Sequence, residues 1–91
     1  MDERRRHART NVSWPIRLWV DEGSLVGRTE DTSEGGICVA IAPTASVKLG
    51  SSYRVDVLAS HMGPFSVIGE ARHVDNRKVG FETDRLLPLV E

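Results

Sequence analysis

Residues 12–20 read VSWPIRLWV, and an apolar residue stands at every second position of this stretch. Successive side chains of a β-strand point to opposite faces, so the alternation predicts a strand with one buried face and with Ser13 and Arg17 on the other. Pro15 lies inside the stretch and has no N–H to donate to a neighbouring strand. We therefore expect this strand at the edge of a sheet, or bulged at Pro15.

Five further strands are predicted along the chain. Runs of apolar and β-branched residues predict them near residues 25–30, 36–42, 53–57, 65–74 and 78–83. Residues typical of turns separate these runs at 21–24, 31–36 and 75–77, and a longer loop covers 43–52. Six short strands joined by tight turns indicate an all-β antiparallel sandwich or barrel. The end of the chain, residues 84–91, is expected to form a short helical turn with Leu86, Leu87 and Val90 facing inward.

The composition is that of one soluble globular domain. The chain has 91 residues, of which 40% are hydrophobic and 27% charged. It contains no apolar run of membrane-spanning length and no apolar stretch typical of a secretion signal, so we expect no membrane insertion and a cytoplasmic location. The single cysteine, Cys38, excludes an internal disulfide. It stands in the apolar run 37–41, which predicts a buried small hydrophobe rather than a reactive thiol.

Positive charge is concentrated near the start of the chain. Residues 4–9 hold four of the twelve basic residues and no acidic one, although the whole chain has a net charge of −1. A basic segment on a mildly acidic body indicates a local anion site rather than a broad nucleic-acid-binding face. We interpret residues 1–10 as a flexible, arginine-rich, ligand-binding arm and residues 11–91 as the folded β domain.

Two arginines of this arm, Arg5 and Arg9, are four residues apart. A planar guanidinium can fork onto phosphate oxygens, bind the O6/N7 edge of guanine, or stack on a purine. The same residues also fit a solvated basic tail or a non-specific nucleic-acid arm. The arginines alone leave these interpretations open.

A second pattern, D-x-S-x-x-G, is formed by Asp31, Ser33 and Gly36. Asp and Ser in a turn commonly bond to their own backbone, so the pattern alone also fits an Asx-turn. In a binding site, the carboxylate accepts hydrogen bonds from the N1–H and N2 amino groups of a guanine, and the hydroxyl adds one more. Gly36 allows the backbone to approach a neighbour closely or to take a positive φ angle.

The two patterns together, R-x-x-x-R over residues 5–9 and D-x-S-x-x-G over 31–36, resemble the PilZ family of bacterial cyclic di-GMP receptors. The segments GEAR at 69–72 and VGFE at 79–82 look like the closing hairpin of that family, and the resemblance covers residues 3 to 86. It implies a six-stranded antiparallel β-barrel of the split-barrel type, which agrees with the strand count. It also implies that cyclic di-GMP is the ligand.

The resemblance assigns roles to the matching positions. Arg5 and Arg9 are implied to hold the phosphates and guanines of the ligand. Asp31 and Ser33 are implied to read a guanine edge, with Gly36 giving close approach.

Two further positions are candidates for ligand binding. Arg4 directly precedes the first motif arginine, where in PilZ-like proteins the residue is thought to influence whether one ligand or a stacked pair binds. An arginine there can stack on a second guanine, so we expect an intercalated pair. His73 stands seven residues before Gly80, where some relatives carry a stacking aromatic residue. A lone histidine on a strand equally fits a surface or packed residue.

The sequence does not indicate an enzyme. One cysteine and three scattered histidines lack the spacing of a zinc site, and we expect neither a metal nor a resident cofactor. No nucleophile elbow with an orienting acid and no glycine-rich phosphate loop is present, so no catalytic residue is assigned.

These observations predict a receptor and adaptor in second-messenger signalling. The ligand would clamp the arm onto the barrel, a disorder-to-order change that creates a surface for an unidentified effector protein. The alternative is a protein-interaction module with a PilZ-like barrel that works without ligand. Binding of nucleic acid through the arm is disfavoured by the acidic body and by an aromatic content of 5%.

Overall fold

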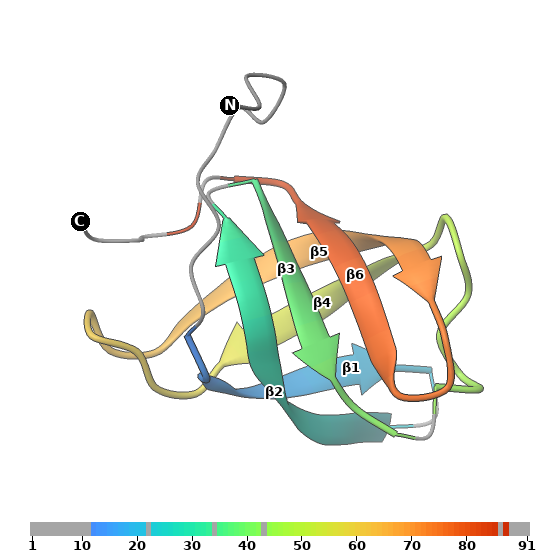
Figure 1. Ribbon diagram of the computed structural model, residues 1–91, viewed down its shortest axis with the longest axis horizontal. Helices are drawn as coiled ribbons and strands as arrows, with labels where there is room; N and C mark the ends of the chain where they lie inside the picture. The colour runs from blue at the N-terminus through green and yellow to red at the C-terminus, as the bar shows by residue number, and fades with distance from the viewer. Residues whose placement is uncertain (1–11, 22, 34, 43, 86, 88–91) are drawn as a thin grey trace, which may run out of the picture.

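The computed structural model describes residues 12–21, 23–33, 35–42, 44–85 and 87, and all regular secondary structure in these residues is β (Figure 1). The strands are β1 Pro15–Val20, β2 Gly23–Ser33, β3 Gly36–Ala40, β4 Ser52–Val57, β5 Phe65–Val74 and β6 Lys78–Thr83. The all-β prediction is confirmed, and the predicted bounds of β5 and β6 agree with the structure.

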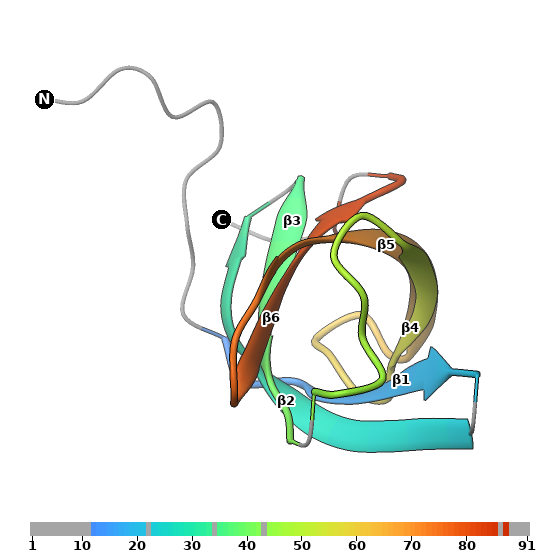
Figure 2. The same cartoon turned by 90° about the vertical axis from the view of Figure 1, so that its right-hand side faces the viewer.

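The six strands form a closed antiparallel barrel in the order β1-β2-β3-β6-β5-β4, with β4 pairing back onto β1. The strands can be followed around the barrel in Figure 2. Closure pairs every strand on both sides and so removes the exposed edges of an open sheet. Of the two architectures that the strand pattern leaves open, the barrel is the one observed.

The expectation that β1 is an edge strand or bulged at Pro15 is wrong. β1 pairs with β2 on one side and with β4 on the other. Pro15 is the first residue of β1, a position where a strand tolerates proline because no ladder N–H is needed there. Its carbonyl oxygen accepts a hydrogen bond of 2.8 Å from the backbone N–H of Leu58.

The core consists of residues at alternate positions of the strands, whose side chains point into the barrel. Ile16 and Leu18, which the pattern in 12–20 predicts to be inside, are fully buried. The largest fully buried apolar side chains come from all strands except β2 and are Ile16, Leu18, Val39, Val55, Val57, Val67 and Val79. Trp14 packs edge-to-face against Phe65, with ring centroids 5.7 Å apart.

The C-terminal segment differs from the predicted helical turn. Residues 84 and 85 form a bend rather than a helix, and Leu87 is buried as expected. The rest of the predicted turn, including Leu86 and Val90, lies outside the described residues.

Residues 12–14 run beside β2 and are tied to it at Thr29. The buried Thr29 hydroxyl accepts a hydrogen bond of 2.8 Å from the Trp14 N–H and donates to the Val12 carbonyl. The Thr29 N–H donates to the Trp14 carbonyl at 2.9 Å. These bonds fix where the chain enters the barrel.

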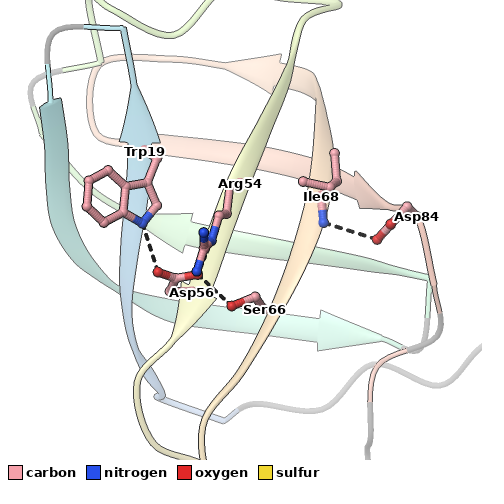
Figure 3. Close-up of polar contacts among 6 residues, drawn as sticks. All are labelled: Trp19, Arg54, Asp56, Ser66, Ile68 and Asp84. Atoms are coloured by element: carbon pink, nitrogen blue, oxygen red, sulfur yellow. Dashed lines mark hydrogen bonds and ion pairs between the residues drawn. The ribbon is translucent and has the colours of Figure 1, made fainter.

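A polar network lies on the outer face of β1, β4 and β5 (Figure 3). The Asp56 carboxylate accepts hydrogen bonds from Trp19 Nε1 at 2.8 Å, from Arg54 Nε at 2.8 Å and from the Ser66 hydroxyl at 2.6 Å. Burial works against ionisation of Asp56, but these hydrogen bonds and the Arg54 charge outweigh it and lower its pKa from 3.8 to about 2. Each of the three strands contributes to this network, so it ties β1, β4 and β5 together.

Candidate ligand-binding site

Two β-bulges shape the outer wall of the barrel. The register of β2 against β3 shifts between Thr29 and Asp31, and that of β5 against β6 shifts between Ala71 and His73. A bulge adds one residue to a strand and so interrupts the alternation of its side chains. Thr29 and Ala71 are buried, whereas Asp31 is half-buried and His73 is exposed.

The register places the predicted site residues in two neighbouring rows across the wall. Asp31, Cys38, Gly80 and His73 form one row, in which each residue is paired with the next. Ser33, Gly36, Glu82 and Glu70 form the second row in the same way. Paired residues in a sheet share a face. Candidates from β2, β3 and β5 thus come together, although 40 residues of sequence separate Ser33 from His73.

A surface groove of about 540 Å³ lies on this wall. It is lined by Ser33, Gly36, Cys38, Arg72, His73, Glu82 and neighbouring residues of β3 and β6. Three predicted site residues, Ser33, Gly36 and His73, therefore meet in one groove. Asp31 is not among the lining residues and lies two residues before Ser33 on β2, in the row that contains His73.

The prediction that Asp31 and Ser33 lie in a turn is wrong. Both are in β2, which continues to Ser33 because residues 31–33 pair with Cys38, Ile37 and Gly36 of β3. The connection is confined to residues 34 and 35. Strand geometry therefore sets the directions of the Asp31 and Ser33 side chains.

Gly36 permits a close approach between two strands. A Cβ atom at this position would lie 2.9 Å from the carbonyl oxygen of Phe81, closer than real Cβ contacts. Its φ angle is not positive. Of the two uses that the sequence allows for this glycine, the structure supports close backbone packing, here of β3 on β6.

Charged side chains surround the groove. Arg72 bridges two carboxylates, with Nη1 3.3 Å from Glu70 and Nη2 3.1 Å from Glu82. His73 Nε2 lies 3.7 Å from Asp75 Oδ2. These side chains are largely exposed, and exposed ion pairs contribute little free energy, so a ligand can replace them at small cost.

The lining also includes residues that the sequence did not assign to the site, among them Cys38, Arg72 and Glu82. Cys38 was predicted to be buried, but it is half-buried and lines the groove. The alternation of the buried Ile37, Val39 and Ile41 carries the signal that residue 38 faces outward. Arg72 faces outward, as alternation after the buried Ala71 predicts, and the bulge in β5 turns the next residue, His73, outward beside it.

The remaining predicted site residues, Arg4, Arg5 and Arg9, lie outside the described residues, as does the predicted arm over residues 1–10. Within the described part of the chain, no group of three or more His, Cys, Asp or Glu side chains could hold a metal ion. The same part contains no helix long and apolar enough to cross a membrane.

The closed barrel and the groove on its outer wall define a small β-barrel domain with a ligand-sized surface site. The family model of the PilZ domain matches residues 3–88, and the chain belongs to this family. The resemblance seen in the sequence is thereby confirmed. A comparison with curated proteins found no match.

Solved structures of PilZ domains have the same fold. The "PilZ domain with c-di-GMP of YcgR from Escherichia coli" matches with a TM-score of 0.79 and 18% identity, covering 94% of this chain and 82% of that chain. The PilZ domain of CeSA from a cellulose-synthesizing bacterium gives a TM-score of 0.71 at 18% identity, covering 84% and 79%.

The Bacillus subtilis inhibitor of motility, MotI/DgrA, matches with a TM-score of 0.76 and 21% identity. The match covers 96% of this chain but 46% of that protein, so the chain spans less than half its length. At these identities the similarity concerns the fold.

Proposed function

We propose that this protein is a cyclic di-GMP receptor that acts as an adaptor. The observation that carries the proposal is the convergence of Ser33, Gly36 and His73 on one groove, with Asp31 in the same row as His73. The resemblance to the PilZ family implies that residues at these positions contact the ligand. A PilZ domain of the same fold, that of YcgR, is described with cyclic di-GMP.

The chemistry of the groove suits a guanine-containing phosphodiester. The Asp31 carboxylate accepts from the N1–H and N2 amino groups of a guanine, and Ser33 supplies a hydroxyl. His73 is exposed and can stack on a base. The volume of about 540 Å³ falls within the usual range of small-molecule sites, roughly 300 to 1,000 Å³.

In this proposal, Arg5 and Arg9 bind the phosphates and the guanine faces of the ligand, and Arg4 stacks on a second ligand molecule. The point of entry of the chain allows this. The Val12 carbonyl accepts a hydrogen bond from Thr29 on β2. Three residues of chain span at most about 11 Å, so Arg9 cannot lie farther than that from Val12. Arginines brought over the groove would neutralise the two phosphate charges and cover the ligand.

The adaptor role follows from this arrangement. A ligand held between the arm and an outer wall of the barrel creates a combined surface that the ligand-free protein lacks. We propose that an effector protein recognises this surface.

Isothermal titration of cyclic di-GMP into the purified protein tests the proposal. We expect binding by the wild type and its loss in Arg5→Ala, Arg9→Ala and Ser33→Ala. Arg77→Ala, on the exposed β5–β6 turn outside the groove, is the matched control and should bind normally. Two ligands per chain in the wild type and one in Arg4→Ala would support the stacked pair.

Titration with a second ligand tests whether the site recognises guanine. Cyclic di-AMP has the same phosphodiester ring but lacks the N1–H and N2 amino groups that Asp31 is proposed to bind. It should bind at least tenfold more weakly, which corresponds to a loss of about 1.4 kcal/mol of binding free energy. No binding of cyclic di-GMP by the folded wild type would refute the receptor proposal and leave an adaptor that works without ligand.

A further inference from the structure

Arg72 occupies a distinctive position in the groove. It lies within the bulge of β5, beside His73, and both side chains point outward. In a regular strand one of two consecutive residues would face the core, so the bulge adds a second side chain to the site. Among the described residues that line the groove, Arg72 is the only one with a permanent positive charge.

The two carboxylates that Arg72 contacts differ in their location. Glu82 lines the groove and is paired with Gly36, whereas Glu70 lies outside the lining. Separate nitrogens make the two contacts: Nη1 lies 3.3 Å from Glu70 and Nη2 lies 3.1 Å from Glu82. Arg72 can therefore release Glu82 and keep Glu70.

The Glu82 carboxylate is unfavourable for an anionic ligand. Its side chain is 59% exposed in the groove, so its charge faces the space that a phosphodiester would enter. Like charges at short range repel, and in the structure Arg72 offsets this charge. An exposed carboxylate–arginine pair is worth little, whereas a phosphate can take two parallel hydrogen bonds from a guanidinium.

We propose that Arg72 binds a ligand phosphate and that Glu82 holds this arginine in the ligand-free groove. On binding, Nη2 exchanges the Glu82 carboxylate for a phosphate oxygen while Nη1 keeps Glu70. Glu82 thus lowers the affinity, and Arg72 raises it by a direct contact. The inference rests on the proposed function, since it concerns the same site and a phosphodiester ligand.

Titration with cyclic di-GMP of single variants gives the first test. Arg72→Ala should weaken binding about tenfold or more, as expected for loss of a hydrogen bond to a charged group. Arg72→Lys keeps the charge but not the fork, and should lie between Arg72→Ala and the wild type. Glu82→Gln should strengthen binding a few-fold. Arg77→Ala, on the exposed β5–β6 turn outside the groove, is the matched control and should bind like the wild type.

A double variant separates direct binding from simple neutralisation of Glu82. If Arg72 only offsets the Glu82 charge, Arg72→Ala has no effect in a Glu82→Gln background. If Arg72 contacts the phosphate, the same change still weakens binding about tenfold there. Thermal unfolding of each variant shows whether it is folded. If the alanine variant does not fold, Arg72→Lys replaces it in the comparison.

The outcomes distinguish this inference from the proposed function. Wild-type binding combined with equal affinity of Arg72→Ala, or with no effect of Arg72→Ala in the Glu82→Gln background, overturns the Arg72 assignment alone. Absence of wild-type binding overturns both.

Discussion

Replacing Asp56 by Asn tests how much the network on the outer face of β1, β4 and β5 stabilises the barrel. Asp56 accepts hydrogen bonds from Trp19, Arg54 and Ser66, and its side chain is 18% exposed. Asparagine keeps the shape of the side chain but removes its charge and one of its acceptor oxygens. The loss should therefore appear as a pH-dependent difference in the free energy of unfolding.

The magnitude follows from the pKa of Asp56, which is lowered from 3.8 to about 2. One pKa unit corresponds to about 1.4 kcal/mol, and partial exposure to water reduces the effect, so we expect about 1 to 2 kcal/mol. Because the folded-state pKa is depressed, this stability is fully present above the unfolded value of 3.8. It is lost as the pH falls from there through about 2.

Urea unfolding of the wild type and Asp56→Asn between pH 7 and pH 2 measures the effect. The difference should be about 1 to 2 kcal/mol at pH 7 and should shrink between pH 4 and pH 2. Asp21→Asn, at an exposed position after β1, is the control and should unfold like the wild type. Equal stability of Asp56→Asn and wild type at pH 7, or a difference that does not change with acidification, would refute the reasoning.

Three further substitutions probe the barrel by urea unfolding. Gly36→Ala places a Cβ atom 2.9 Å from the Phe81 carbonyl oxygen and should destabilise by about 1 to 3 kcal/mol; unchanged stability would show that β3 can shift freely. Thr29→Val removes the acceptor of the Trp14 N–H and should cost about 1 to 3 kcal/mol, with faster hydrogen exchange at Trp14; unchanged exchange would contradict this. Leu18→Ala empties a fully buried site and should cost about 2 to 5 kcal/mol, whereas a loss below about 1 kcal/mol would mean that the core collapses around it.

The strands could be predicted because their alternation is visible locally. The predicted and observed bounds agree for β5 and β6, and Asp75 explains the turn between them, since its carboxylate accepts from the backbone N–H groups of Arg77 and Lys78 at 2.9 Å. The end of β2 was not predicted. Asp31 and Ser33 are typical turn residues, but pairing with β3 outweighs their local preference.

The site was predicted in part. Ser33, Gly36 and His73 do line one groove, and Asp31 lies in the same row as His73. Cys38 was assigned to the core because its neighbours are apolar, although it stands between inward-facing positions. The roles of the arginines in the arm and the stacked pair of ligands remain predictions, to be tested by the titrations.

The bulges explain why alternation alone cannot reveal this site. Thr29 and Ala71 face the core, so in regular strands Asp31 and His73, each two residues further on, would face it as well. A carboxylate in an apolar core is strongly unfavourable without a partner. The extra residue in β2 and in β5 turns both side chains outward and into the same row, across Cys38 and Gly80. The polar wall therefore depends on two register shifts that become apparent only when the strands are paired.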